Sequence, residues 1–294
     1  MSEREFALFL GCTIPVRCLG YEVATRRVAE ELGIKLVDLS FSCCGYPLKN
    51  VDVVAAKSMA TANLALAESK NLNILTICSA CAGTLTEASV NRENPVGEQV
   101  KKELGKQGLT FKGLVWVKHF VRYLYEDYGV DKIREHVKNP LKNLRVAIHY
   151  GCHYLRPSEI YDEFDDPEHP KSAKEIIEAL GATVVNYRGQ LDCCGGGTLT
   201  FDQKLGAILA KKKLDNVKKA NVDALVLFCP FCSIMYDGHQ RFIEEQFGCE
   251  PYNIPVLFLP QIMGLAFGID PKELGFEYNK VDVQPLLEKI GVKG

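Results

Sequence analysis

The chain has 294 residues, of which 47% are hydrophobic, and this composition supports a packed core and about two domains of ordinary size. Its 35 Lys and Arg residues nearly balance its 37 Asp and Glu residues, so no basic surplus indicates a nucleic-acid partner. The longest uncharged apolar run, residues 254–269, is shorter than the roughly 20 residues that span a bilayer. The first residues show no signal-peptide pattern. We therefore expect a cytoplasmic protein that binds neither membranes nor nucleic acids.

The predicted elements alternate between short apolar runs and amphipathic stretches, which is typical of parallel βα units. The predicted strands of the first half are residues 6–10, 34–39, 72–77 and 114–117. Apolar residues at helical spacing predict helices around residues 21–32 and 53–67, and a helical region over 116–137. The predicted strands of the second half are residues 145–149, 183–186, 222–228 and 256–259. The sequence therefore predicts an α/β fold of two tandem, Rossmann-like units with about four parallel strands each, related by a pseudo-two-fold axis.

Twelve cysteines are the unusual feature of the composition. In a reducing compartment, cysteines at this number more often bind metal or carry out redox chemistry than form disulfides. Ten of them form two matched sets, each with a single cysteine, a doublet followed by glycine, and a C-x-x-C element. The first set is Cys12, Cys43, Cys44, Cys78 and Cys81, and the second is Cys152, Cys193, Cys194, Cys229 and Cys232. Cys18 and Cys249 are unmatched, and we expect neither to be a ligand.

The spacing within the two sets repeats as well. The doublet precedes the C-x-x-C element by 34 residues in the first half and by 35 in the second, whereas the single cysteine precedes the doublet by 31 and 41 residues. The ten extra residues, 161–170, are acidic and interrupted by prolines, which predicts a surface insertion. A repeat of this length indicates two homologous units. We place the boundary between them so that residues 1–140 and 141–294 form one cysteine-rich domain each.

All three cysteine elements of each half follow predicted strands. Ligands of open parallel sheets gather at the carboxyl ends of the strands, so five thiols per half can converge there. Each C-x-x-C element opens onto a predicted helix, whose N-terminal end favours thiolate over thiol. Neighbouring residues of a strand point to opposite faces, so a doublet that serves one site needs a sharp turn. Gly45 and Gly195 permit such a turn.

Five thiolates per site restrict the metals that fit. Soft thiolate ligands select zinc, copper(I) or iron–sulfur clusters. A structural zinc and an ordinary 4Fe-4S cubane each take four protein ligands, so each set has one cysteine too many unless some thiolates bridge two irons. Two zinc sites, a thioredoxin-like dithiol at residues 229–232 and a set of merely buried cysteines stay open at this point, and iron–sulfur ligation is favoured over all three.

The doubled motif resembles that of the cysteine-rich CCG-domain family, and the chain from Phe6 to Leu259 is similar to the B subunits of the CoB–CoM heterodisulfide reductases of methanogenic archaea. The resemblance implies that the five cysteines of each half bind one noncubane 4Fe-4S cluster. It implies reduction of the mixed disulfide of coenzyme M and coenzyme B (CoM-S-S-CoB) to two thiols in methanogenesis. It also implies electron bifurcation in a complex, where a small ferredoxin-like subunit receives electrons from a flavoprotein subunit with a hydrogenase or formate dehydrogenase.

The chain itself has neither a C-x2-C-x2-C-x3-C run nor a glycine-rich dinucleotide fingerprint, so its electrons must come from another protein of the complex. His153, next to Cys152, is predicted to donate a proton to a departing thiolate, or alternatively to hydrogen-bond a cluster sulfur. Basic residues near the cysteine loops are predicted to bind the sulfonate and phosphate ends of the disulfide. These residues are Arg17, Lys49, Arg156 and Arg188.

Two other functions are compatible with the same cysteines. CCG domains also occur in subunits linked to lactate, glycolate and succinate oxidation, so an electron-transfer subunit of such a complex is one alternative. A zinc-binding scaffold subunit without enzymatic activity is the other. The iron, zinc and acid-labile sulfide content of the chain separates clusters from zinc.

Overall fold

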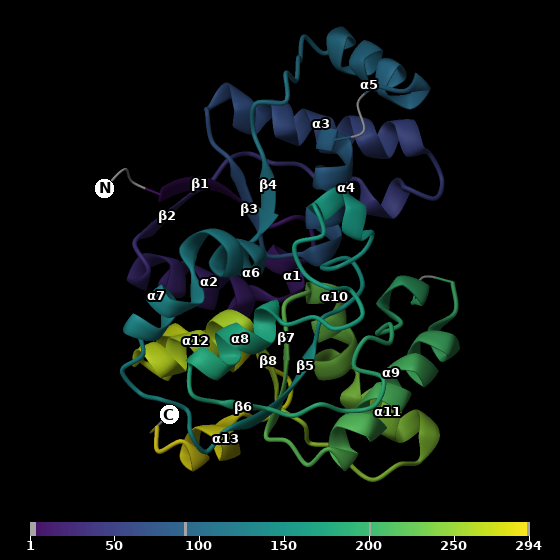
Figure 1. Ribbon diagram of the computed structural model, residues 1–294. Coiled ribbons are helices and arrows are strands. Elements are labelled where there is room, and N and C mark those ends of the chain that lie inside the picture. The colour runs from purple at the N-terminus through teal and green to yellow at the C-terminus, as the bar shows by residue number, and fades with distance from the viewer. Residues whose placement is uncertain (1–3, 91–92, 200, 293–294) are drawn as a thin grey trace.

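In the computed structural model, the chain folds into two α/β units, each built on a four-stranded parallel sheet (Figure 1). The structure describes residues 4–90, 93–199 and 201–292. The first sheet has the order β2-β1-β3-β4 and consists of β1 (Arg4–Phe9), β2 (Ile34–Val37), β3 (Ile74–Thr76) and β4 (Val117–His119). The second has the order β6-β5-β7-β8 and consists of β5 (Arg145–His149), β6 (Thr183–Val184), β7 (Ala224–Leu227) and β8 (Val256–Phe258). The predicted pair of tandem units is confirmed.

Helices connect the strands in both units. The first unit contains α1 (Ile14–Arg17), α2 (Leu19–Glu31), α3 (Val53–Ser69), α4 (Ser79–Val90), α5 (Pro95–Lys106), α6 (Phe120–Tyr123) and α7 (Val130–Glu135). The second contains α8 (Ser172–Ala179), α9 (Gln203–Lys219), α10 (Pro230–Ser233), α11 (Gln240–Phe247), α12 (Leu259–Phe267) and α13 (Gln284–Lys289). The π-helical turns η2 (Leu124–Tyr128) and η5 (Ile234–Gly238) continue α6 and α10. Short 3-10 turns are η1 (Tyr46–Leu48), η3 (Ser158–Tyr161), η4 (Gly196–Thr198), η6 (Pro271–Glu273) and η7 (Phe276–Tyr278).

The long helices α3 and α9 begin in the same way. Each is capped by an aspartate that follows the second cysteine of its doublet by eight residues. Asp52 accepts hydrogen bonds from the backbone nitrogens of Val54 and Ala55 at 3.0 and 2.9 Å, and Asp202 accepts one from Leu205 at 2.8 Å. Such caps satisfy backbone donors that a helix start leaves unpaired. The caps therefore fix the point at which each doublet loop joins its helix.

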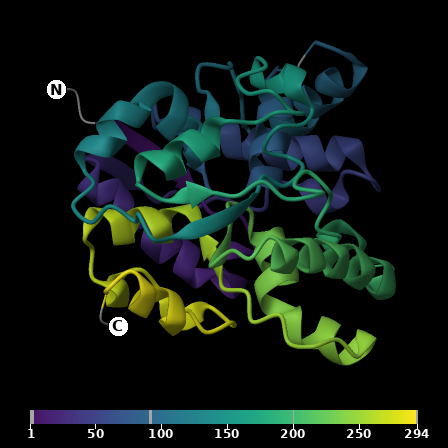
Figure 2. The ribbon, with the colours of Figure 1, turned by 60° about the horizontal axis from the view of Figure 1, so that its bottom comes forward.

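Helices of the two units pack against each other. Figure 2 shows α12 of the second unit (yellow) against α2 of the first (purple), and α8 of the second unit packs on α6 and α7 of the first. All nine residues of α12 are buried, as expected for a helix that is apolar on every side. The backbone nitrogens of Lys138 and Asn139 both donate to the carbonyl of Ala266 in α12. The chain thus passes between the units along this helix, and the boundary at residue 140 stays a prediction.

The prediction for the last strand of the first unit was wrong in its position. The expected strand at residues 114–117 overlaps β4 only at Val117, and the region expected to be helical from residue 116 begins with this strand. The reason is Glu68, whose carboxylate accepts hydrogen bonds from the backbone nitrogens of Lys112, Gly113 and Leu114 at 2.7 to 2.8 Å. These bonds hold the chain outside the sheet until Trp116.

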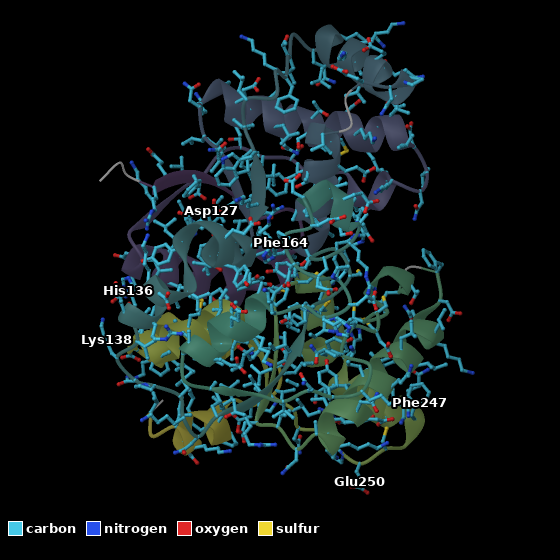
Figure 3. All side chains as sticks on the ribbon, in the orientation of Figure 1. Asp127, His136, Lys138, Phe164, Phe247 and Glu250 are labelled. Atoms are coloured by element: carbon cyan, nitrogen blue, oxygen red, sulfur yellow. The ribbon has the colours of Figure 1, made fainter. Side chains whose placement is uncertain are left out.

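The predicted surface insertion at residues 161–170 is partly buried, which corrects that expectation. Tyr161 is 4% exposed, and Asp165, also 4% exposed, accepts hydrogen bonds from the backbone nitrogens of Lys171 and Ser172 at the start of α8. Phe164 lies near the middle of the molecule (Figure 3), with the guanidinium of Arg122 4.7 Å from its ring centroid. The insertion therefore joins the two units, because its aromatic residues pack on the first unit.

We predict that Gly20→Ala destabilises the contact between the units. A Cβ at Gly20 in α2 would lie 2.4 Å from the carbonyl oxygen of Gly275 in the second unit, so one of the two segments must shift. Overpacking of this kind costs about 1–3 kcal/mol in the free energy of unfolding, measured by anaerobic urea denaturation. Gly105→Ala is the matched control, because a Cβ there, in α5, would meet no atom within 4 Å, and it should be neutral or slightly stabilising. Equal stability of the two variants would contradict the prediction.

Candidate functional site

Each cysteine doublet lies in a loop that turns at a glycine. Gly45 and Gly195 have φ values of +89° and +80°, in the left-handed region. A Cβ at Gly45 would lie 2.4 Å from the carbonyl oxygen of Ala56, and one at Gly195 would lie 2.7 Å from that of Gly206. These carbonyls belong to α3 and α9, so each loop packs directly on the helix that follows it. Both the backbone angle and the available space require glycine here, in agreement with the sequence analysis.

The matched thiols of both halves form one continuous line of side-chain contacts. In the first half the contacts run Cys12, Cys43, Cys44, Cys81, Cys78, and in the second they run Cys152, Cys193, Cys194, Cys232, Cys229. The two lines meet because Cys78 contacts Cys229. Since these two cysteines occupy equivalent positions, their contact places the pseudo-two-fold axis of the units between them. The structure thus brings together all ten cysteines that the repeat singles out.

Thiols along this line share protons. The pKa of Cys44 is lowered to about 7, chiefly by a hydrogen bond from Cys81, and that of Cys193 is lowered to about 2, chiefly by one from Cys152. Cys229 has its pKa lowered well below the usual range by hydrogen bonds from Cys232 and Cys78. Thiolates are stable in such a buried place only with partners of this kind. Because metal ligands must be deprotonated, a bound cationic centre can take the place of these shared protons.

The thiols of each half surround a point that a metal centre can occupy. In the first half, a small cavity is lined by Cys12, Cys44, Cys78 and Cys81 together with Tyr46 and Phe231. In the second half, the Sγ atoms of Cys194 and Cys232 and a ring nitrogen of His149 all lie within 4.8 Å of one another. The donor set in both places is dominated by soft thiolate sulfur, which suits iron–sulfur clusters or zinc.

Tyr46 and His153 form a pair between the two halves. Tyr46 follows the first doublet and His153 follows Cys152, and the His153 Nε2 lies 3.0 Å from the Tyr46 hydroxyl. The two rings meet edge to face with centroids 5.1 Å apart. Burial lowers the pKa of His153 and raises that of Tyr46 to about 12, and the nearby Cys152 and Cys229 add to the latter shift. The pair is therefore uncharged at neutral pH and is joined by one hydrogen bond between the Tyr46 hydroxyl and the His153 Nε2.

The corresponding positions on the other side of the pseudo-two-fold axis carry small residues. Gly196 follows the second doublet where Tyr46 follows the first, and Thr13 follows Cys12 where His153 follows Cys152. A Cβ at Gly196 would lie 3.3 Å from the Sγ of Cys194 and 3.4 Å from the Cβ of Phe231. An aromatic pair therefore covers one side of the line of thiols, whereas on the other side Gly196 packs directly against Cys194 and Phe231.

The four basic residues predicted to bind substrate are not gathered at one point. Lys49 pairs with Glu87 at 2.5 Å, and its charge adds to the effect of burial in lowering the pKa of His153. Arg156 is bound to Glu168 at 2.8 Å in the insertion. Arg17 lines a separate cavity with Cys18 and Asp237, and Arg188 is exposed. A substrate role for each of them stays a prediction.

The unmatched cysteines lie outside the line of thiols. The Cys18 Sγ contacts the carbonyl of Pro230 at 3.8 Å, and burial raises the pKa of Cys18 to about 12. The Cys249 Sγ lies 3.8 Å from the hydroxyl of Tyr252 and 4.0 Å from the carbonyl of Ile243. Their surroundings are those of ordinary packed cysteines.

Tyr46 and His149 belong to the site but were not predicted from the sequence. His149 is 1% exposed at the end of β5, and its Nε2 lies 3.2 Å from the Sγ of Cys232. Burial and the charge of Lys213 lower the pKa of His149 well below its usual range, so the ring is neutral. Adjacency to the motifs could have indicated both residues, since Tyr46 directly follows Cys-Cys-Gly and His149 precedes Cys152 by three positions.

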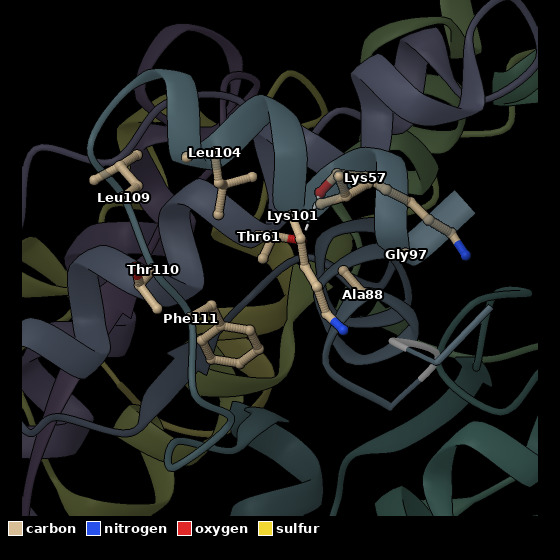
Figure 4. A pocket seen from close by; sticks show the side chains of 11 residues that line it. Lys57, Thr61, Ala88, Gly97, Lys101, Leu104, Leu109, Thr110 and Phe111 are labelled. Atoms are coloured by element: carbon tan, nitrogen blue, oxygen red, sulfur yellow. Dashed lines mark hydrogen bonds between the residues drawn. The ribbon is translucent and has the colours of Figure 1, made fainter. Parts of the chain in front are cut away.

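A separate, mostly apolar cavity lies away from the thiols (Figure 4). It has a volume of about 380 Å³ and lies between α3, α4, α5 and the segment that follows α5. Its walls are mostly apolar, with Leu104, Leu109 and Phe111 beside Lys57 and Lys101. No cysteine lines it among the described residues. This cavity is therefore distinct from the candidate site.

Comparison with known proteins agrees with this geometry. A profile of the family described as "Cysteine-rich domain" (CCG) matches residues 6–86 and 146–237. The chain belongs to this CCG family. It is 36% identical to the B subunit of the ferredoxin:CoB-CoM heterodisulfide reductase of Methanosarcina mazei over 97% of both chains. It is 33% identical to the 8-methylmenaquinol:fumarate reductase membrane anchor subunit of Wolinella succinogenes, over 97% of this chain and 99% of that one.

A solved structure of a hypothetical protein from Helicobacter pylori has a TM-score of 0.78 to this chain at 16% identity. The match covers 96% of this chain and 53% of the other, and it supports the fold alone. Among the described helices of this CCG-family chain, none is long and apolar enough to cross a membrane.

His119 at the end of β4 links the two halves beside the thiols. Its Nδ1 accepts a hydrogen bond from the Val121 backbone at 3.2 Å, and its Nε2 donates to the carbonyl of Phe228 at 3.0 Å. Both ring nitrogens are therefore used by the neutral form. Burial lowers the pKa of His119 to about 4 from 6.5, although the bond to Phe228 opposes the shift.

We predict that His119 makes the protein less stable as the pH falls. Because the unfolded chain binds the proton first, His119 stabilises the folded state above pH 6.5, and this contribution is lost as the pH falls toward about 4. At pH 4.5 the loss is roughly 2.5 kcal/mol. His119→Phe introduces the residue found at the equivalent position 258. Between pH 7.5 and 4.5, its free energy of unfolding, measured by denaturant titration, should fall by roughly 2.5 kcal/mol less than that of the wild type. Identical pH dependence in the two proteins would refute this role.

Proposed function

We propose that this chain is the disulfide-reducing subunit of a heterodisulfide reductase-type complex and acts on CoM-S-S-CoB. In this proposal the ten matched cysteines hold two noncubane 4Fe-4S clusters, five cysteines to each. The observation that carries it is the contact between Cys78 and Cys229, which joins two five-thiol sets from equivalent positions of the two halves. Relatives that are 36% identical over 97% of the chain and named as B subunits of heterodisulfide reductases support it.

The residues of the site fit clusters better than two zinc ions. Each half offers five cysteines, and every one of them contacts another cysteine of its own set. A closed tetrahedral zinc site takes four ligands, so the fifth thiol of each set would contact the other cysteines without binding the metal. Backbone nitrogens also donate to the doublet sulfurs, such as Gly45 to Cys43 at 3.5 Å and Gly195 to Cys193 at 3.4 Å. Hydrogen bonds of this kind are common around clusters.

Cleavage of the mixed disulfide needs two electrons and two protons, and it yields two thiols. The bound clusters would supply the electrons. The residues of the chain position the substrate and supply a proton: the hydroxyl of Tyr46 and Nε2 of His153 hold one at the junction of the halves, next to Cys152. Lys49, whose charge acts on His153, is our choice among the four candidates for an anionic end of the substrate.

The electrons must reach this chain from a partner. The sequence has no ferredoxin-type cysteine run, and the similar proteins are named as subunits of reductase complexes. We propose a small ferredoxin-like subunit as the direct donor. A flavoprotein subunit, with a hydrogenase or formate dehydrogenase, would supply it by electron bifurcation.

The metal content of the anaerobically purified chain tests the cofactor assignment. We expect about eight irons with matching acid-labile sulfide per chain and no zinc. Cys81→Ser and Cys232→Ser should each lose iron, because these sulfurs lie inside the line of thiols. Cys18→Ser and Cys249→Ser are the matched controls and should keep it. Two zinc ions without sulfide would refute the proposal.

Substitution of the Tyr46 and His153 pair tests the proton-transfer role. Tyr46→Phe and His153→Gln should lower the turnover number for CoM-S-S-CoB reduction with an artificial reductant by roughly a hundredfold or more, with the iron content unchanged. His136→Gln is the control, since His136 bonds the Tyr128 hydroxyl, at 2.9 Å, instead of Tyr46. Unchanged turnover in both variants would exclude the pair as proton donor.

Quinol-linked electron transfer is the second candidate function. The relative from Wolinella succinogenes is named as the membrane anchor subunit of an 8-methylmenaquinol:fumarate reductase, and the match covers 97% of this chain. The same anaerobic preparation should therefore be assayed in parallel for reduction of CoM-S-S-CoB by an artificial electron donor and for oxidation of a menaquinol analogue by an artificial electron acceptor. We expect turnover in the disulfide assay only. Turnover with the quinol alone would favour the electron-transfer function over the disulfide reductase.

A further inference from the structure

The two halves differ behind their otherwise matched thiols. His149 is the last residue of β5 and precedes Cys152 by three positions, and Phe9 has the same place in β1 before Cys12. Tyr236 follows the second C-x-x-C element by four residues, and Leu85 follows the first by four. A polar pair in the second half thus replaces an apolar pair in the first.

His149 contacts the innermost thiols of the second set. Its Nε2 lies 3.2 Å from the Sγ of Cys232. Its Nδ1 is buried and has no hydrogen-bond partner among the described residues. Because an unpaired buried N–H is costlier than an unused lone pair, the ring proton belongs on Nε2 and points at the sulfur. His149 therefore donates a hydrogen bond to Cys232.

The ring of His149 is held in this orientation by Tyr236. The two rings meet edge to face at 80°, with centroids 4.9 Å apart, and both residues are at most 1% exposed. The hydroxyl of Tyr236 is buried and has no hydrogen-bond partner among the described residues, so Tyr236 supports the imidazole by ring packing alone.

The first half offers no such donor at the equivalent thiol among the described residues. Phe9 and Leu85 are fully buried, and Phe9 packs on Phe41 with ring centroids 4.9 Å apart. In the part of the chain that the structure describes, the side-chain hydrogen-bond partners of Cys81 are thiols, Cys44 and Cys78. A hydroxyl approaches the first set at the exposed end of the line, where the Thr13 Oγ1 lies 3.8 Å from the Sγ of Cys12.

Backbone donors do not account for the difference, because they are matched. Gly45 donates to Cys43 at 3.5 Å and Gly195 donates to Cys193 at 3.4 Å. The second cysteine of each doublet also receives a backbone hydrogen bond, from Tyr46 in the first half and from Gly196 in the second. The imidazole of His149 is thus an additional donor that distinguishes the second set from the first.

We propose that the hydrogen bond from His149 to Cys232 makes the metal cluster of the second half the easier of the two to reduce. Hydrogen bonds to ligand sulfurs stabilise the more negative, reduced form of an iron–sulfur centre and raise its potential. The inference rests on the proposed function in requiring a cluster in each half. If so, the first electron to enter the chain resides on the cluster of the half that carries Cys232. His149 then acts through Cys232 and determines which cluster is reduced first.

A redox titration of the iron-loaded, anaerobic protein, followed by electron paramagnetic resonance with low-potential mediators, tests this proposal. We expect the wild type to show two separate reduction steps. His149→Phe, which copies the first half, should shift the upper step to a more negative potential and leave the lower step in place. His149→Gln keeps an N–H donor and should retain a step close to that of the wild type. His136→Phe, which removes a histidine that bonds Tyr128 rather than a thiol, is the control and should change neither step.

A second measurement keeps the test decisive if His149→Phe fails to assemble its second cluster. In the wild type with 15N-labelled histidine, the first-reduced signal should show a weak nitrogen coupling and an exchangeable proton. A strong coupling, which indicates nitrogen bound to iron, or no coupling at all, would overturn the proposal. So would an unshifted upper step in iron-loaded His149→Phe. An iron-free wild type would instead overturn the proposed function on which this inference rests.

Discussion

Ten thiols in mutual contact at the junction of two sheets are the constraint to which the rest of the structure conforms. Buried thiolates are unfavourable without partners, so the sulfurs are stable only if they share protons or a metal centre. Their convergence requires the carboxyl ends of both sheets to face each other. It also requires the sharp turns at Gly45 and Gly195, and it explains why the doublet loops press on α3 and α9 closely enough to exclude any side chain at these glycines.

The helix contacts between the units hold the two cysteine sets in a fixed position relative to each other. α12 of the second unit lies on α2 of the first, and α8 packs on α6 and α7. The insertion at residues 161–170 adds a further link, since Phe164 packs under the guanidinium of Arg122. Either unit alone would expose the apolar helix α12 or its partner surface, so the two units are expected to fold together. This dependence fits relatives whose similarity extends over 97% of the chain.

The symmetric frame holds an asymmetric interior. Tyr46 and His153 cover one side of the pseudo-two-fold axis, whereas Gly196 and Thr13 occupy the equivalent places on the other. Behind the thiols, His149 replaces Phe9. A repeat with equal halves would treat the two sulfurs of a bound disulfide alike, but a mixed disulfide has two different ends. Under the proposed function, the differences between the halves would distinguish these two ends in space and, by our inference, in the order of electron delivery.

The sequence by itself determined the repeat, the α/β class, most of the strands and the set of ten cysteines, because these depend on local periodicity and on spacing along the chain. It could not locate β4, since the carboxylate of Glu68 from a distant helix end diverts residues 112–114 from the sheet. It missed Tyr46 and His149, although both lie near the motifs, because their partners His153 and Cys232 are distant in the chain. The contact of Cys78 with Cys229 and the pairing of Tyr46 with His153 were decided only by the tertiary structure, which brings together residues far apart in the chain.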